Sequence, residues 1–369
     1  GRWGDFEPFR PAVVAQPAPD EWKPERVRFL AIEAVPTFRS ISLYTPFAHD
    51  ANANAECGVR YRVHGTEAWH RGMDLIRSTE EAEFRGSLLQ LQPDTTYEIE
   101  LTARDPDGAG VLPRLIQRTW SETLPIAEER VLSAGDVGEP LTIRARGQPD
   151  GWIRYAPPPG ESTTIAVGAD APYAVRIEGA AFVVLERVTV RGGTEHGVLV
   201  TDSHDIRIRR CEVTGWGVAG TRNAVGLYVA PSGGTINCQD AIHLGLLTRR
   251  IVVEDNFIHT PCGTATCWRY GHPVGPQATT LGYNGSRNNV VRNNDIVGSE
   301  EHWYNDIIGS TGNGSPFGGP YRDTDIHGNF MSHSQDNAVE LDGGQMNVRF
   351  WDNRMEYTYR SISFAPCIK

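Results

Sequence analysis

The sequence predicts an all-β protein in two parts, a sandwich of antiparallel strands followed by a parallel β-helix. Residues 22–123 alternate apolar and polar side chains with the period of two that half-buried strands show. From residue 124 onward, a short apolar pattern recurs between turns rich in Gly, Asn and Asp. The length of 369 residues exceeds what one compact core usually serves, which also favours two domains.

The first part is predicted to contain a Pro-rich arm and then a β-sandwich. Residues 1–21 lack any periodicity and read as an arm. In residues 22–123, the segments "SISLYTPF", "GVRYRVHG" and "TTYEIELTARDPDG" are expected strands separated by turn signals, as a sandwich requires. The alternation in the third segment points Tyr97, Ile99 and Leu101 inward.

The stretch "LLQLQPDTTYEIELTARDPDG" resembles the fibronectin type III module. In that family a Leu, a Pro and a Tyr form the tyrosine corner, and Leu91, Pro93 and Tyr97 match them. Trp69 lies near the place where the family often carries a Trp. The resemblance implies a fibronectin type III-like sandwich over residues 22–123, which in that family is mostly a spacer or binding module.

The second part, residues 124–369, contains six octets that align with one another. They are "VVLERVTV", "IRIRRCEV", "IVVEDNFI", "NVVRNNDI", "TDIHGNFM" and "VRFWDNRM". Two columns are apolar throughout and are expected to face the interior. The third place holds Leu185, Ile208, Val253, Val291, Ile326 and Phe350, and the eighth holds Val190, Val213, Ile258, Ile296, Met331 and Met355.

The spacing of the octets predicts stacked coils. The first two third places are 208 − 185 = 23 residues apart, which is the length of a coil with two or three short strands. The sixth place holds Asn256, Asn294, Asn329 and Asn353 in the last four octets. Asn tolerates left-handed backbone and suits a repeated turn, and stacked Asn side chains can bond along the axis.

A second strand is expected before each octet, in "HGVLVTD", "AVGLYVA", "TTLGYNG", "NDIIGST" and "NAVELDG", and in "SISFAP" after the last. Together these segments resemble the right-handed parallel β-helix superfamily of pectate-lyase-like enzymes, polysaccharide hydrolases, epimerases and phage tailspikes. The resemblance covers residues 126–369 and is specific for fold rather than for function. Because no polar capping segment follows "SISFAP", we expect the helix to continue beyond Lys369.

Three carboxylates near the end of the chain are the candidate catalytic groups. In "NAVELDGG" the apolar Val339 and Leu341 face inward, so Glu340 and Asp342 face outward, about 7 Å apart at Cα. Glycoside hydrolysis commonly uses two carboxylates at about 5 to 9.5 Å. We expect Glu340 to be the general acid and Asp342 the base or nucleophile, with Asp336 as a further catalytic candidate.

The expected substrate is a polysaccharide, and its binding residues are sought in the neighbouring coil and loops. Aromatic rings suit the apolar faces of sugars. The long insertions 231–248, 261–280 and 310–322 are where a β-helix builds the walls of a binding site. The candidate substrate-binding residues are His302, Trp303, Tyr304, Asp306, Arg322 and Tyr283.

Two other functions stay open at this stage. A Ca²⁺-dependent polysaccharide lyase would use an Arg base such as Arg287, Arg322 or Arg360, with Glu340 and Asp342 as Ca²⁺ ligands. A Lys base is excluded mid-chain, because the only two Lys are near the ends. A non-catalytic surface protein would be a rigid rod with unrelated residues on the outer faces of adjacent coils. Catalysis instead predicts that the acids and an aromatic or Arg side chain converge in one cleft.

Composition limits the cofactors and partners. The net charge of −11 and the absence of a basic run argue against nucleic-acid binding. The six cysteines show no metal-binding spacing, so no metal is expected except Ca²⁺ in a lyase. No run of about 18 apolar residues exists to span a membrane. We expect a secreted or cell-surface bacterial protein, whose targeting peptide would be removed or lie outside this sequence.

Overall fold

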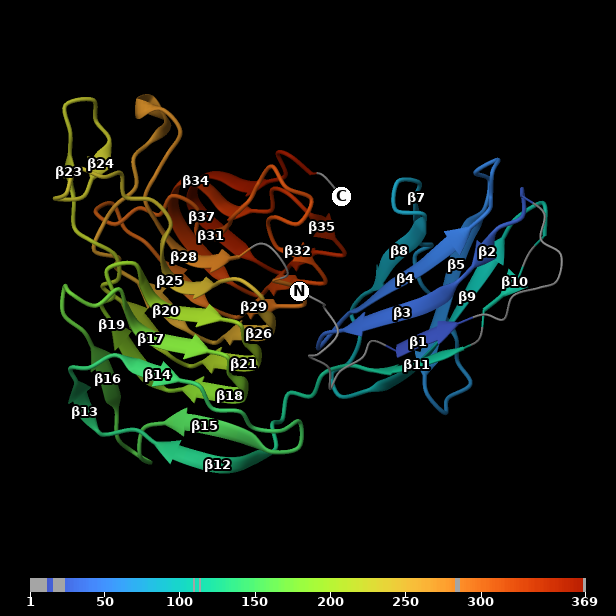
Figure 1. Cartoon of the computed structure of the whole chain (residues 1–369), viewed down its shortest axis with the longest axis horizontal. Helices are drawn as coiled ribbons and strands as arrows, with labels where there is room; N and C mark the ends of the chain where they lie inside the picture. The colour runs from blue at the N-terminus through green and yellow to red at the C-terminus, as the bar shows by residue number, and fades with distance from the viewer. Residues whose placement is uncertain (1–11, 16–23, 109, 113, 283–285, 368–369) are drawn as a thin grey trace. The chain divides into compact units, whose positions relative to one another are not determined.

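A computed structural model describes residues 12–15, 24–108, 110–112, 114–282 and 286–367 (Figure 1). The chain divides into two compact units between Leu124 and Pro125. The described residues form strands, turns and a single 3₁₀ turn at Trp268–Tyr270, in agreement with the predicted all-β class. In this part of the chain, no helix has the length and hydrophobicity needed to cross a membrane.

The first unit consists of two antiparallel sheets around one hydrophobic core, which includes Leu43, Ile99 and Leu101. Part of the expected arm, β1, is a strand that pairs with β3. One sheet contains β1 (Ala12–Ala15), β3 (Ala31–Pro36), β4 (Ile41–Ala48), β8 (Glu83–Leu88) and β7 (Ile76–Ser78), with β2 (Arg28–Phe29) on β4. The other contains β10 (Gly110–Val111), β9 (Thr96–Arg104), β5 (Glu56–Val63) and β6 (His70–Arg71), with β11 (Leu115–Arg118) on β9.

The residues behind the fibronectin type III resemblance have a mixed outcome. The Tyr97 hydroxyl accepts a hydrogen bond of 2.9 Å from the backbone N–H of Gln92, and Leu91 is buried, as a tyrosine corner requires. Trp69 is not part of the hydrophobic core, because it lies half-exposed under the guanidinium of Arg60 at 4.5 Å. The family assignment therefore stays a prediction.

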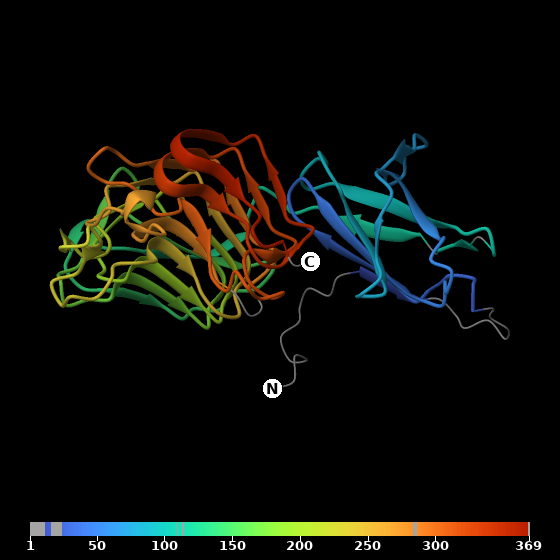
Figure 2. The same ribbon diagram turned by 90° about the horizontal axis from the view of Figure 1, so that it is seen from above.

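The second unit contains two long parallel sheets, which are compatible with the predicted parallel β-helix (Figures 1 and 2). One has eight strands in the order β12 (Ile126–Val131), β15 (Trp152–Ala156), β18 (Ala181–Glu186), β21 (His204–Arg209), β26 (Arg249–Glu254), β29 (Val290–Arg292), β33 (Asp325–His327) and β36 (Arg349–Trp351). Each strand in this sheet pairs in parallel with its equivalent one coil further along the chain.

The other sheet has 14 strands, because the long strands β34 (Phe330–Glu340) and β37 (Arg354–Ser363) join two rows of shorter ones. One row is β13 (Gly135–Val137), β16 (Thr163–Ala166), β19 (Val188–Arg191), β22 (Glu212–Thr214), β27 (Phe257–His259) and β30 (Asp295–Val297). The other row is β14 (Leu141–Ile143), β17 (Tyr173–Glu178), β20 (His196–Thr201), β25 (Gln239–Leu244), β28 (Pro276–Leu281) and β31 (Ile308–Ser310). Two short pairs, β23 (Thr221–Arg222) with β24 (Tyr228–Val229) and β32 (Tyr321–Arg322) with β35 (Gln345–Met346), lie apart from both sheets.

The two apolar columns of the octets form the core between the sheets, as predicted. Their members are fully buried except Phe350 and Met355 in the last octet, which pack against the core while partly exposed. The fifth place of each octet, rather than the expected sixth, takes the left-handed backbone. These residues are Arg187, Arg210, Asp255, Asn293, Gly328 and Asp352, with φ between 53° and 68°.

The four Asn at the sixth place form the expected ladder along the stack of coils. Nδ2 of Asn256 donates to Oδ1 of Asn294, Asn294 donates to Asn329, and Asn329 donates to Asn353, each at 2.9 Å. Each Oδ1 also accepts a backbone N–H from the preceding coil, as Oδ1 of Asn294 does from Asn256. The ladder thereby satisfies buried polar groups at a turn that the sheets leave unpaired.

Substituting Asn294→Ala should destabilise the protein by about 3 kcal/mol, because the side chain makes four hydrogen bonds in the interior. Urea unfolding followed by hydrogen exchange of β29 and β30 would measure the loss. Asn223→Ala provides the control, since Asn223 is an exposed Asn at the turn between β23 and β24, outside the ladder. A loss for Asn294→Ala no larger than for the control would contradict a structural ladder.

One predicted strand was wrong, and the error matters for the site. The segment "AVGLYVA" does not form a coil strand, because its residues Tyr228–Val229 pair with Thr221–Arg222 in an antiparallel hairpin. The strand at this place in the stack is β25, which pairs in parallel with β20 and β28. The expected loop 231–248 therefore contains a core strand of the second unit.

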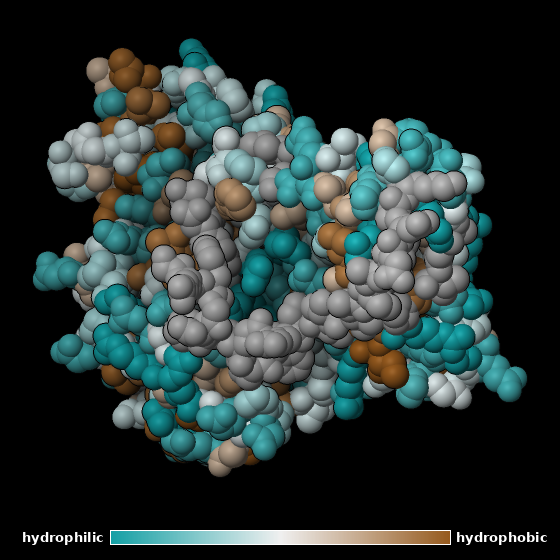
Figure 3. Space-filling view, turned by 45° about the vertical axis from the view of Figure 1, so that its right-hand side comes forward, coloured by the Kyte–Doolittle hydropathy of each residue, from teal (hydrophilic) through white to brown (hydrophobic). Residues whose placement is uncertain are grey.

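Among the coloured residues in Figure 3, hydrophilic ones predominate and hydrophobic ones form small separate patches.

Candidate functional site

The row of strands β25, β28, β31 and β34 has a bend at which two consecutive residues face the core. Because both point inward, the residues before and after the bend both lie on the outer side, and they approach one another. In β25, Oδ2 of Asp240 is 2.6 Å from Nδ1 of His243, and in β28 the Thr280 hydroxyl donates to the side-chain oxygen of Gln277. The fully buried inward pairs are Ala241 with Ile242, Ala278 with Thr279, Ile307 with Ile308, and Ala338 with Val339.

Asp306 lies at the centre of the polar side chains on this outer face. Its Oδ1 accepts hydrogen bonds from the backbone N–H and the side-chain amide of Asn337, at 3.1 and 2.9 Å. Its Oδ2 accepts bonds from Gln277 at 3.3 Å and from Asn305 at 3.0 Å. Burial and the charge of Asp336 raise the pKa of Asp306 to about 7, although the bonds from Asn337 oppose the shift. Asp306 was predicted to bind substrate, and the structure places it among the acids.

Glu340 is surrounded by other acids. Burial, followed by the charges of Asp306 and Asp342, raises the pKa of Glu340 to about 8. Its Oε1 accepts a hydrogen bond of 2.8 Å from Nδ2 of Asn313, in the loop that follows β31. Glu340 is 7% exposed, so it is not the open surface carboxylate that alternation alone predicts. A pKa of about 8 favours the protonated form of Glu340 at neutral pH.

Asp342 lies two residues beyond the end of β34 and is 5% exposed. Its Oδ1 accepts hydrogen bonds from the Ser363 hydroxyl at 2.8 Å and from the backbone N–H of Ala365 at 2.6 Å. The following coil thus covers a carboxylate that was expected to be open. Asp342 contributes negative charge to the neighbouring acids, since it raises the pKa of Glu340 and of Asp336.

Asp336 connects the acids to an exposed aromatic side chain. Its Oδ1 accepts a hydrogen bond of 3.3 Å from the indole of Trp268, and its Oδ2 is 3.4 Å from Nε2 of His272. Burial and the charge of Asp342 raise the pKa of Asp336, while His272, the indole bond and the charge of Arg360 oppose the shift. Asp336 therefore has basic side chains beside it, whereas the charges acting on Glu340 are all acidic.

Trp268 presents part of its ring to solvent beside this carboxylate. It is 37% exposed, and its ring lies 5.9 Å from that of Tyr359, which is 58% exposed. The guanidinium of Arg360 lies 5.8 Å from the Trp268 ring and 5.7 Å from the Tyr359 ring. These three side chains come from two coils. Trp268 belongs to the insertion after β27, and Tyr359 and Arg360 belong to β37.

Four of the expected substrate-binding residues do not lie among the contacts of these acids. Tyr304 is fully buried, and its ring stacks on Trp216 at 6.2 Å in the core, which argues against a role in stacking a sugar. The indole N–H of Trp303 donates to the carbonyl of Glu300. The backbone N–H of His302 donates to the carbonyl of Ser299, and Arg322 pairs with Asp323 at 2.9 Å. Tyr283, the last of the candidates, lies outside the described residues.

A group of two histidines and one aspartate on β20 and β25 was not predicted from the sequence. His196, Asp240 and His243 each offer one metal-ligating atom, and these atoms lie within 4.8 Å of one another. Assigning 231–248 to a loop concealed that β25 follows β20 in the stack. With the correct alignment, "QDAIHL" places Asp240 directly opposite His196.

A polar chain connects this group to the acids. The Thr280 hydroxyl bonds to Oδ1 of Asp240 at 2.7 Å and to Gln277, and Gln277 donates to Asp306. The outer face of four neighbouring coils is therefore one continuous network of titratable and amide side chains. Carboxyls with perturbed pKa values are frequent at functional sites. Burying like charges together reduces stability, so such a cluster is retained where function requires it.

No protein-family model matches the chain, and a comparison with curated proteins finds no match. The fold and the site define an all-β protein with long parallel sheets and a cluster of buried acids on one outer face.

Proposed function

We propose that the protein is a secreted enzyme that acts on a polysaccharide, and that it hydrolyses glycosidic bonds. The observation that carries the proposal is the burial of Glu340 among Asp306, Asp336 and Asp342, where Asp336 contacts the partly exposed Trp268. A glycoside hydrolase needs one carboxylic acid that holds a proton at neutral pH and a second carboxylate that is ionised.

Glu340 would act as the general acid and protonate the glycosidic oxygen of the leaving group. Its pKa of about 8 keeps it protonated over the neutral range. Asp336 would act as the ionised partner, as a base toward water or as a nucleophile toward the anomeric carbon, because His272, the Trp268 indole and Arg360 oppose the rise in pKa that burial causes. It suits this role better than Asp342, because it contacts Trp268 and His272, whereas Asp342 is bonded to Ser363 and the backbone of the following coil.

Trp268 and Tyr359 would bind a sugar through its apolar C–H face. Both rings are exposed and neighbouring, and sugars stack on such rings with little loss of side-chain entropy. Arg360, which lies beside both rings, carries a positive charge that could pair with a carboxylate or sulfate on the glycan. An acidic polysaccharide is therefore the preferred substrate class.

A polysaccharide lyase is the second candidate, and Arg360 is the observation that favours it. Its positive charge acts on Asp336, so an arginine lies beside the acids as a lyase requires. In that case the carboxylates would bind Ca²⁺ and neutralise the uronate. The rod hypothesis, by contrast, does not account for four neighbouring acids held in an interior environment.

A screen against neutral, uronic and sulfated polysaccharides tests the proposal. We expect new reducing ends on an acidic glycan without absorbance near 235 nm, an approximate wavelength at which a lyase product absorbs because elimination leaves a C=C bond. Absorbance at that wavelength, abolished by a Ca²⁺ chelator, would replace hydrolysis by elimination. Neither signal on any glycan of the panel would favour the non-catalytic rod.

A further inference from the structure

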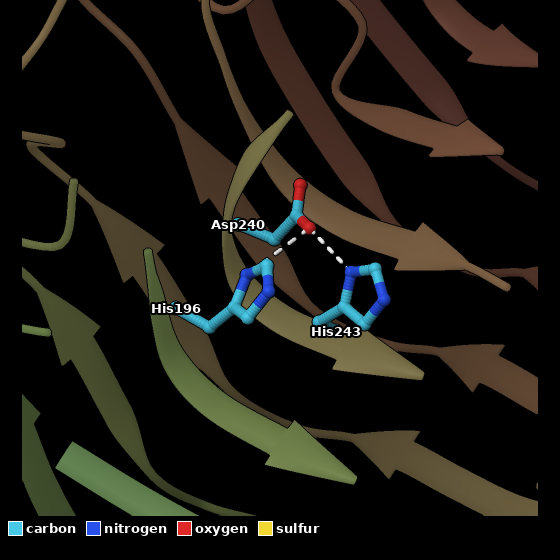
Figure 4. A group of neighbouring side chains, drawn as sticks. All are labelled: His196, Asp240 and His243. Atoms are coloured by element: carbon cyan, nitrogen blue, oxygen red, sulfur yellow. Dashed lines mark hydrogen bonds and ion pairs between the residues drawn. The ribbon is translucent and has the colours of Figure 1, made fainter. Parts of the chain in front are cut away.

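We propose that His196, Asp240 and His243 bind one divalent transition-metal cation of the zinc class. Figure 4 shows the arrangement, with the Asp240 carboxylate directed at both imidazole rings, one from β20 and one from β25. Two imidazole nitrogens and one carboxylate oxygen are a donor set that zinc uses in sites with an open coordination position. The proposal does not depend on the proposed glycosidase activity.

The distances between the donor atoms suit one shared cation. Two ligands of a tetrahedral zinc at about 2.1 Å lie about 3.4 Å apart. Nδ1 of His196 is 3.3 Å from Oδ2 of Asp240, close to that value. Nδ1 of His243 is 2.6 Å from the same oxygen, which is a hydrogen-bond distance. A cation would replace the shared proton and open this contact by about 0.8 Å.

The orphaned nitrogen of His196 is the second observation. Its Nδ1 is buried and has no hydrogen-bond partner among the described residues, although Oδ2 of Asp240 is 3.3 Å away. A buried nitrogen without a partner costs free energy that a bound cation would remove. The Nδ1 atoms of both rings face Oδ2 of Asp240. The rings themselves stack at 4.3 Å with an angle of 22°, so one ring has to turn about its Cβ–Cγ bond for both lone pairs to meet at one cation.

Neighbouring residues orient the Asp240 carboxylate, and the two histidine side chains stay partly accessible to solvent. The Asp240 side chain is fully buried, and its Oδ1 accepts a bond from Thr280, which orients Oδ2 toward the rings. The side chains of His196 and His243 are 15% and 20% exposed, so a fourth ligand could come from water or substrate. Two neutral imidazoles and one carboxylate would leave the site a net charge of +1 with a dication bound.

The experiment measures Zn²⁺ binding by the purified full chain. After chelator treatment and dialysis, titration calorimetry with ZnCl₂ should show one equivalent bound. Asp240→Asn and His243→Ala should each weaken binding at least about 100-fold, beyond the 10- to 100-fold typical of residues behind the ligands. His259→Ala is the matched control, because His259 forms a two-residue pair with Glu212 at 3.0 Å on β22 and β27. Its affinity should not change.

If a variant fails to fold, a second measurement on the wild-type protein tests the same site. Anomalous diffraction at the zinc edge from wild-type crystals grown with ZnCl₂ should give a peak within coordination distance of all three side chains. No binding, equal loss in the His259→Ala control, or a peak elsewhere would overturn the proposal. The activities of Glu340 variants do not enter this experiment, so the metal site and the proposed glycosidase function succeed or fail separately.

Discussion

Replacing Glu340 by Gln should lower kcat by about 10²- to 10⁴-fold, the usual contribution of a general acid. The substitution keeps the shape of the side chain and can keep the hydrogen-bond contact with Asn313, but it removes the proton donor. KM should change little, because the substitution leaves the proposed sugar contacts of Trp268 and Arg360 in place. The wild-type rate should fall above pH 8, where Glu340 loses its proton, and the variant should lack this decline.

The leaving group provides a sharper readout of the same substitution. An aryl glycoside with an acidic phenol needs little protonation, so Glu340→Gln should slow its hydrolysis far less than that of the polysaccharide. Glu178→Gln is the matched control, because Glu178 is a partly exposed Glu in β17 of the same sheet, paired with Arg144 and Arg176. Full activity of Glu340→Gln on the natural glycan would remove Glu340 from the mechanism.

The fold was largely predictable, because each place of the repeat holds residues that share one physical role. A column of apolar side chains at fixed places in each octet can only be buried by stacking coils, and an Asn at the sixth place can bond to an equivalent Asn in the next coil. The left-handed residue was misplaced by one position, because Asp255 and Asn293 at the fifth place are as compatible with that backbone as Asn256 and Asn294 are.

The site was only partly predictable, because its acids acquire their character from residues far away in the sequence. Alternation identified Glu340 as outward-facing, yet it could not reveal that Asp306, 34 residues earlier, is its main charged neighbour. The bend also breaks strict alternation, since Ala338 and Val339 both face the core. Strict alternation likewise places Asp240 and His243 on opposite faces of β25, so it could not predict that they meet.

Stability should fall as the pH rises from about 4.5 to about 8, because the folded state holds protons on Glu340 and Asp306 that the unfolded chain releases. Both carboxyls have a pKa raised by folding, so their stabilising contribution is complete below the unfolded pKa values and is lost through the folded ones. Each unit of pKa shift is worth about 1.4 kcal/mol, and the two groups share their charge repulsion. We expect a loss on the order of 3 kcal/mol across this range.

Glu340→Gln should remove much of this dependence and make the protein more stable than wild type at pH 8.5, since a neutral amide replaces a buried charge beside Asp306. Hydrogen exchange of peptides from β34 in increasing urea, at pH 5 and pH 8.5, measures the effect in the unit that holds the site. Glu178→Gln should retain the wild-type slope, because its side chain is partly exposed and paired with arginines. An unchanged slope in Glu340→Gln would mean that Glu340 is ionised in the folded state at neutral pH, and it could then no longer serve as the acid. The wild-type protein lacks the stability that this substitution adds at high pH. That difference is the stability cost of keeping a buried carboxylate for function.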